Sequence, residues 1–426
     1  MLMQNRSTQW HFWSACLGNF FEHYDTALFG FLSVFLAPLF FPQHDEITAL
    51  ILTYAMIPLG MLSRPLGALL FGFIGDKYGT RHALFLSLCG MSIVTGALAF
   101  CPTYQQAGFI APVIFCIGRT LQNFLTAGET MGGAIFLLES YDQKHHDFLS
   151  GLYNATTIGG ILLASAGVSL LAYLDVVEWG WRVLYLLGCS TGVFGCIIRQ
   201  SLPGNQLKNP SVKKAQSLSN LFSIFWVHRN ALVLIGISSG FAYANYAVAI
   251  ILMNGFVPLV SSITKAQMMT LNTILLILDF CALPFFGWLS SKISREKMML
   301  GASIGSVAFG IPAFLLLPQA SFAGIVGIRI ALVLLGVAFF APFHAWAQNL
   351  VPPTHRYGVI SFGYALGAQC LGAPTAMLSL WAFKATGMAS SVIWYWLLLA
   401  MISSVALILS MRPQADKKLN IIKEII

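Results

Sequence analysis

The chain has 426 residues, of which 57% are hydrophobic and only 9% are charged, and its formal net charge is +8 at pH 7. Ordinary soluble domains carry roughly 25% charged residues, so a soluble protein of this size could not cover its core with so few charges. The composition excludes a soluble globular class and predicts a protein that has the lipid bilayer as its main partner.

Apolar runs long enough to cross a bilayer recur about twelve times along the chain, since about 20 apolar residues span the hydrocarbon core. The first run is too long for a cleavable signal peptide and carries Glu22 and Asp25, so we expect no such leader. The expected spans lie near residues 12–40, 48–72, 83–101, 107–138, 149–173, 181–200, 230–258, 268–290, 298–317, 321–350, 358–382 and 389–411.

Basic residues crowd the connections that follow even-numbered spans, whereas acids such as Asp45 and Glu46 follow odd-numbered ones. By the positive-inside rule, we expect a multi-pass protein of a bacterial inner membrane with both termini in the cytoplasm. The net charge then reflects topology and contact with anionic lipid heads, and no nucleic-acid partner is expected. The basic residues after even-numbered spans are Lys77, Arg81, Lys144, Lys208, Lys213, Lys214, Lys292, Arg295, Lys297, Arg356, Arg412, Lys417, Lys418 and Lys423.

One half of the chain repeats the other. The polar turn Gly72–Arg81 recurs in weaker form as Gly287–Arg295, 215 residues further along. The longest polar connection, 201–228, is predicted to be a cytoplasmic linker between two six-helix bundles, 1–200 and 229–426. We therefore predict an all-α membrane protein with twelve transmembrane helices in two pseudo-symmetric bundles, an arrangement typical of secondary transporters.

The first span carries a polar stripe. At 100° per residue its members fall within an arc of about 120°. Glu22 and Asp25 are neighbours on this face, and two close carboxylates in a low-dielectric site favour a retained proton on one of them. Both are therefore candidate proton-coupling residues. The alternative is that one or both are locked in structural ion pairs with Arg64 or Arg119 that hold the helices together. The stripe consists of Asn19, Glu22, Asp25, Thr26, Phe29 and Ser33.

The fourth span repeats this pattern with Arg119, Gln122 and Glu129 on one face. The planar guanidinium of Arg119 suits a carboxylate, and Glu129 is predicted to be its counterion or a further proton site. Arg64, near mid-membrane in the second span, is the other candidate anion-binding residue. Asn19 and Gln122 are candidate substrate-binding residues beside them. The alternative is a buried charge network that holds the first bundle together.

The second half is chemically poorer. Asp279 is its only expected buried acid and Arg329 its only expected buried base apart from interface positions, and the two are candidates for an ion pair. Tyr246 and its neighbour Tyr243 offer hydroxyls and aromatic faces, which suit an ammonium group. The alternative for these tyrosines is helix packing.

The turn after the second span has a mechanical interpretation. Its glycines permit close helix approach, and Asp76 can meet the positive end of a facing helix. Contacts of this kind would close the cytoplasmic side. The candidate gating residues are Gly72, Asp76, Lys77, Arg81, Glu139 and Arg356.

Four segments together carry a family resemblance: Gly18–Phe31, Arg64–Arg81, Arg119–Glu139 and Pro353–Tyr357. Arg64–Arg81 resembles the loop between the second and third helices of the major facilitator superfamily. The other three segments resemble the metabolite:proton symporter branch of that superfamily, which includes bacterial proline/glycine betaine, α-ketoglutarate and citrate carriers. The resemblance implies the major facilitator fold, with rocking of two bundles about a midplane site.

The chain departs from the pattern of this branch at several positions. His23 and Thr26 replace the usual Trp and Phe, and Thr80 replaces an Arg of the loop motif. Asn123 replaces a common Gly, and His146-Asp147 replace Arg-Gly.

The residues and the resemblance together predict proton-coupled import of a small carboxylate-bearing or zwitterionic metabolite by a monomer. The proton gradient would supply the energy, and we expect no metal or cofactor. The alternative is a facilitator or exporter of polyols or drug-like cations. A membrane-embedded enzyme is disfavoured because no His/Asp/Glu cluster has metal or triad spacing.

Overall fold

The computed structural model describes the backbone of residues 6–67, 70, 71, 74, 80–127, 134, 137, 138, 141–200, 218–352 and 356–425. Within these residues all regular structure is helical, and each of the twelve predicted spans coincides with a helical segment. Eight helical stretches in this part of the chain are long and apolar enough, taken singly, to cross a membrane. The predicted all-α membrane architecture is confirmed.

Each of the first six spans contains one main helix, and the second continues after a turn as a further helical stretch that begins at Arg64. A short helix, α5 (Tyr104–Ala107), follows the third span. We refer to these six spans as the first half. They are α1 (Arg6–Phe40), α2 (Glu46–Met61), α4 (Thr80–Ala99), α6 (Ile110–Thr126), α8 (His146–Tyr173) and α9 (Val177–Gln200).

The last six spans, the second half, follow a short helix, α10 (Leu218–Val227). Three of them are composite, since a second helix continues the first. The segments are α11 (Arg229–Tyr246) with η3 (Ala247–Leu252) and α12 (Met253–Val260), α13 (Lys265–Ile293), α14 (Arg295–Leu316), α15 (Phe322–Phe340) with α16 (Phe343–Asn349), α17 (Arg356–Leu366) with η6 (Gly367–Gly372) and α18 (Thr375–Thr386), and α19 (Trp394–Ile425).

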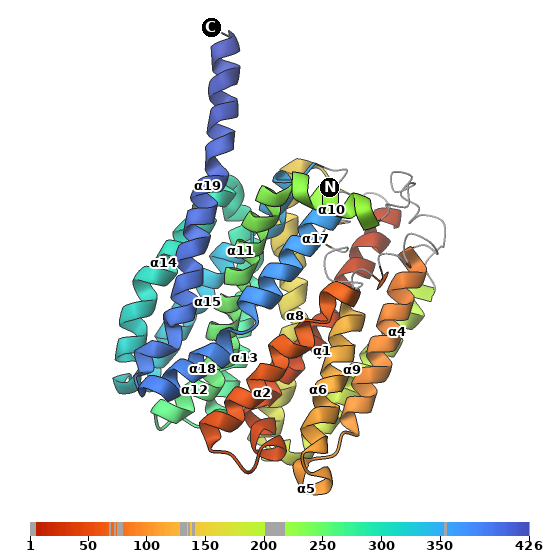
Figure 1. Ribbon diagram of the computed structural model, residues 1–426, viewed down its shortest axis with the longest axis vertical. Coiled ribbons are helices and arrows are strands. Elements are labelled where there is room, and N and C mark those ends of the chain that lie inside the picture. Colours follow the sequence, from red (N-terminus) through yellow and green to blue (C-terminus); the bar gives the residue numbers. More distant parts are fainter. Residues whose placement is uncertain are drawn as a thin grey trace.

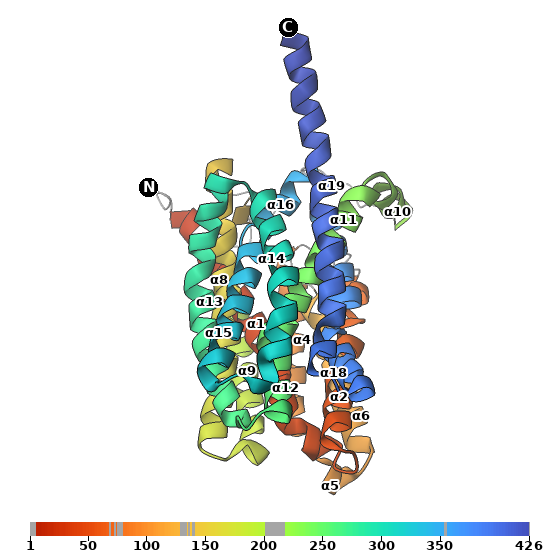
Figure 2. The same cartoon turned by 90° about the vertical axis from the view of Figure 1, so that its left-hand side faces the viewer.

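The helices run side by side along one axis, and both chain termini lie at the same end (Figure 1). We call this the termini end; the opposite end carries α5 and the connection from α1 to α2. Helix α19 continues well beyond the bundle at the termini end (Figure 2). The two halves meet mainly along α8 and α13 and along α2 and α18. The boundaries 1–200 and 229–426 stay a prediction, because residues 201–217 lie outside the described part.

Ion pairs join the halves at the opposite end. Lys384 Nζ lies 3.1 Å from Asp45 Oδ1, and Lys265 Nζ lies 2.7 Å from Glu46 Oε1. Asp45 also caps α2 by accepting hydrogen bonds from Thr48. These bonds from Thr48, with the one from Lys384, lower the pKa of Asp45 to about 2. Its carboxylate loses its charge only when the pH falls through that value, so it does not titrate near neutral pH.

Two composite spans of the second half contain π-helical turns, η3 in the seventh span and η6 in the eleventh. A π turn inserts an extra residue and shifts the side-chain register, and such turns are frequent at functional sites. Tyr246 immediately precedes η3 and is the N-cap of this turn. The break in α-helical register therefore falls beside a candidate substrate residue.

Candidate functional site

A hydrogen-bond chain connects Asp25 to Arg119 through two neutral side chains. The Arg119 Nη1 group donates to Gln122 Oε1. The Gln122 amide donates to Thr95 Oγ1 at 2.7 Å, and the Thr95 hydroxyl donates to Asp25 Oδ2 at 3.2 Å. Every donor points from the guanidinium towards the carboxylate. The chain joins α6, α4 and α1, and Asp25 is only 1% exposed.

Gly188 of α9 makes room for the carboxylate of Asp25. A Cβ atom at this position would lie 2.1 Å from Asp25 Oδ1. The same oxygen is buried and has no hydrogen-bond partner. An unpaired buried carboxylate oxygen is costly, which makes this position suitable for binding a proton.

Arg64 and Arg119 both hold unused hydrogen-bond donors. Arg64 Nε donates to Asn123 Oδ1 at 3.0 Å, but its Nη2 is buried without a partner. Arg119 Nε is likewise buried and unpartnered, and its guanidinium lies 4.8 Å from the centre of the Phe29 ring. The two positive charges repel each other. Both positive charges also act on Tyr243 of α11, which belongs to the second half. We call Arg64 and Arg119 together the positive site. An anion bound here would satisfy the unused donors and relieve the repulsion.

Two further candidates of the first span, Glu22 and Asn19, act on different helices. Glu22 is 2% exposed, and its charge acts on Tyr364 of α17. Asn19 instead donates to α8, at 2.7 Å to Thr157 Oγ1 and at 3.0 Å to Thr156 Oγ1, so its amide links two helices of the first half.

Several predicted site residues lie outside the described residues or are described only in their backbone. Arg81 lies in the first turn of α4, and Arg356 is the first residue of α17. For the following residues the placement stays a prediction: Glu129, Gly72, Asp76, Lys77 and Glu139.

The predicted pairing of Asp279 with Arg329 is wrong. Arg329 is fully buried, and its terminal nitrogens donate to neutral oxygens at 2.5–3.4 Å. Amide and carbonyl oxygens from three helical segments fill the positions that a carboxylate would take. These acceptors are Asn254 Oδ1, Asn272 Oδ1 and the carbonyls of Ala249 and Met268. Asp279 stays buried at 8% exposure without an ion pair in the described part of the chain.

The structure also shows an ion pair between the halves that the sequence did not predict. Arg295 at the start of α14 forks onto Asp147 at the start of α8, with Nε–Oδ1 and Nη2–Oδ2 distances of 2.5 and 3.1 Å. Close packing surrounds it, because a Cβ on Gly287 would lie 2.8 Å from the Asp147 carbonyl oxygen. Two signals in the sequence could have pointed to this contact: the departure from the branch pattern at position 147, and the repeat of the gating turn that ends at Arg295.

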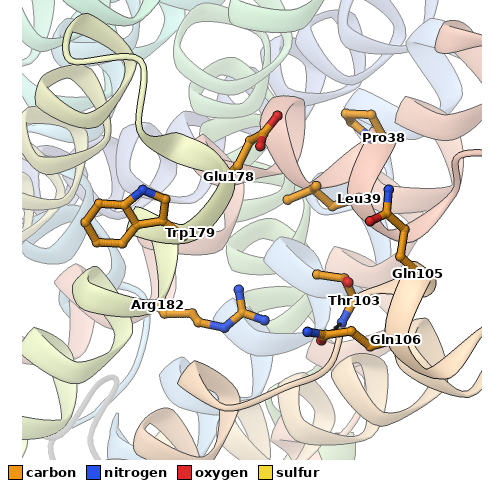
Figure 3. Close-up of a pocket in the computed structure, with 8 residues that line it drawn as sticks. All are labelled: Pro38, Leu39, Thr103, Gln105, Gln106, Glu178, Trp179 and Arg182. Atoms are coloured by element: carbon orange, nitrogen blue, oxygen red, sulfur yellow. Dashed lines mark hydrogen bonds between the residues drawn. The ribbon is translucent and has the colours of Figure 1, made fainter.

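A cavity of about 380 Å³ opens at the opposite end, within the first half (Figure 3). Arg182 lines this cavity. Its guanidinium group donates a hydrogen bond to the Cys101 carbonyl at 3.0 Å and lies 4.2 Å from the centre of the Trp181 ring. The cavity is therefore distinct from the positive site of Arg64 and Arg119. Its lining residues are Pro38, Leu39, Thr103, Gln105, Gln106, Glu178, Trp179 and Arg182. Within the described residues, no group of three or more His, Cys, Asp or Glu side chains is placed to hold a metal ion.

Twelve helical spans in two bundles, with buried charges where the bundles face each other, define a membrane transporter of the secondary type. The sequence profile of the Major Facilitator Superfamily matches residues 15–262, and the chain belongs to this superfamily. It is a multi-pass membrane transporter and not an enzyme.

Known proteins agree with this assignment. The chain is 25% identical over 428 residues to the proline/betaine transporter of Salmonella typhimurium, covering 96% of this chain and 84% of that protein. It is 27% identical over 398 residues to the citrate-proton symporter of Klebsiella pneumoniae, covering 90% and 87%. Its fold resembles the crystal structure of a D-xylose-proton symporter, with a TM-score of 0.71, 17% identity and coverage of 93% and 95%. The predicted resemblance to the symporter branch is confirmed.

Proposed function

We propose that the protein imports a small carboxylate-bearing or zwitterionic metabolite together with a proton, by alternating access. The observation that carries this proposal is the pair of buried guanidinium groups with unused donors, linked by hydrogen bonds to a buried carboxylate. A polyol or a cation would leave those positive charges unbalanced. The relatives named for proline, betaine and citrate all move carboxylate-bearing compounds, which supports the same choice.

Proton coupling follows from the balance of charge around Arg119. When Asp25 is ionised, its charge acts on Arg119 and opposes a second anion there. When Asp25 binds a proton, the positive charge of Arg119 is left for the substrate carboxylate. A protonated Asp25 also changes the donors and acceptors available to Thr95, and through it to Gln122. Proton and substrate therefore favour each other's binding, as symport requires.

The ion pairs at the two ends suit alternating access. Asp45–Lys384 and Glu46–Lys265 join the halves at the opposite end, and Asp147–Arg295 joins them at the termini end. We propose that these sets break in turn as the halves rock, with the termini end in the cytoplasm of a bacterial cell. The positive-inside rule supports this orientation, and a single chain supplies both halves of the site, so a monomer suffices.

Reconstituted protein tests the proposed function. In a thermal-shift screen over betaines, amino acids and di- and tricarboxylates, we expect a carboxylate-bearing compound to stabilise the protein. Proteoliposomes should then concentrate that compound when the pH is lower outside, and a protonophore should abolish the gradient. Binding confined to polyols or to cations without a carboxylate would contradict the proposal.

Asp147→Asn should release the termini end. The substitution removes the charge from a bidentate pair with side chains only 10–17% exposed, which we expect to shift the equilibrium between the closed and open termini end by about 2 kcal/mol, or about thirtyfold. Spin labels at His145 and Lys297 should report a longer distance between the halves. The matched control is Asp142→Asn, because Asp142 pairs with Lys144 within the first half and is exposed. An unchanged distance distribution in Asp147→Asn would exclude the ion pair as a latch.

A further inference from the structure

Asp279 is a buried acid in the second half that the mechanism above does not use. It lies mid-way along α13 and is 8% exposed. Among the described residues, none forms a hydrogen bond or ion pair with it, and Arg329 is held by neutral oxygens instead. An unpaired carboxylate at bilayer depth is costly, so such a group is a functional site by default.

Two tyrosines form an aromatic pair near the C-terminal end of α11, in the seventh span. Tyr243 and Tyr246 pack edge to face, with ring centres 6.2 Å apart. The Tyr246 hydroxyl is buried without a hydrogen-bond partner, and the charge of Asp279 acts on it. An aromatic face beside a carboxylate is the chemistry that attracts an organic ammonium group.

The same tyrosines connect this acid to the positive site of the first half. Tyr243 experiences the charges of both Arg64 and Arg119, whereas Tyr246 experiences that of Asp279. The charges of two guanidinium groups and of one carboxylate therefore act on the aromatic pair. A ligand held there would meet positive charge on the first half and negative charge on the second.

We propose that Asp279, Tyr246 and Tyr243 form a cation subsite, which binds the ammonium group of a zwitterion whose carboxylate is bound by Arg64 and Arg119. This inference rests on the proposed function and narrows its substrate class. A single molecule then bridges the two halves, one pole on each. Di- and tricarboxylates are disfavoured, because their additional carboxylate would face Asp279 with like charge.

Pairs of ligands that differ only in the ammonium charge test the cation subsite separately from the carboxylate site. Glycine betaine carries a trimethylammonium group, and 3,3-dimethylbutyrate has the same shape with a neutral tert-butyl group in its place. The purified full-length protein should bind glycine betaine at least about tenfold more tightly than 3,3-dimethylbutyrate in calorimetric titrations. Proline and cyclopentanecarboxylate form a second pair for a secondary ammonium group.

The variant Asp279→Asn should bring the affinity ratio within each pair close to one. The affinity for the neutral analogue should hold or rise, since the carboxylate pole is intact. Asp279→Glu keeps the charge and should restore discrimination, which separates loss of the subsite from loss of folding. Tyr246→Phe keeps the aromatic face and should reduce the ratio less than Tyr246→Leu does.

Three results would overturn the inference. The first is an unchanged ratio in Asp279→Asn, and the second is an equal loss for both members of a pair. The third is intact discrimination with loss of pH-driven uptake alone, which would make Asp279 a proton site. If the protein concentrates citrate but binds no zwitterion, the subsite fails while the proposed function stands. If no carboxylate-bearing compound is bound at all, the proposed function itself fails.

Discussion

Asp25→Asn is expected to abolish uptake driven by a pH gradient while leaving exchange of labelled for unlabelled substrate at equal pH measurable. The asparagine amide cannot take up and release a proton, so the pH gradient can no longer drive accumulation of the substrate. Exchange needs no net proton movement, and the neutral side chain leaves Arg119 free to bind the substrate carboxylate. Proteoliposome uptake and counterflow, measured on one preparation, distinguish the two activities.

Control variants place this effect at the carboxyl group itself. Glu22→Gln should act more mildly and mainly on affinity, since Glu22 is not part of the hydrogen-bond chain from Arg119 to Asp25. Gly188→Ala leaves all charges in place but puts a Cβ 2.1 Å from Asp25 Oδ1, so it should weaken coupling by displacing the carboxyl group. Gly327→Ala, where no atom lies within 4 Å of the added Cβ, should behave like the wild type.

A clear result would refute the role of Asp25. If Asp25→Asn vesicles still concentrate substrate in response to an imposed pH gradient, this residue is structural. Glu129 on the fourth span then becomes the leading candidate for the proton site.

The sequence predicted the spans well because the bilayer imposes one length and one composition on every helix. The polar stripes of the first and fourth spans were also visible, since Asp25 and Arg119 are charged residues inside apolar runs. Charged residues at membrane depth are so costly that their mere presence indicates a site. That rule identified the acids and bases but not what connects them.

The hydrogen bonds and ion pairs between these residues depend on how the helices pack, and the residue pattern of one helix does not reveal that packing. Thr95 and Gly188 are ordinary residues for a membrane helix, and only their position beside Asp25 gives them a role. The predicted pairing of Asp279 with Arg329 failed for a related reason. Opposite charges were the only partners that could be counted in the sequence, whereas in the structure the terminal nitrogens of Arg329 donate to side-chain amides and backbone carbonyls. The ion pair of Asp147 and Arg295 joins residues 148 apart in the chain.

Arg119→Lys is expected to weaken substrate binding by at least about tenfold, or ~1.4 kcal/mol, without changing the charge of the site. The guanidinium has a fixed planar set of donors, one of which binds Gln122 while Nε stays unused. A lysine ammonium is a flexible point charge that cannot serve Gln122 and a carboxylate with the same geometry. Arg64→Lys should act in the same direction, because Arg64 binds Asn123 and also keeps an unused donor.

Arg329→Lys is the matched control for this measurement. Arg329 is as deeply buried and its Nε is likewise unpartnered, but both of its terminal nitrogens already donate to neutral acceptors of the second half. Its replacement should therefore lower the melting temperature of the protein while leaving the affinity of the folded fraction near the wild-type value. Titration of a carboxylate ligand into all three variants separates binding from packing. Wild-type affinity in both Arg119→Lys and Arg64→Lys would mean that the substrate carboxylate is bound elsewhere.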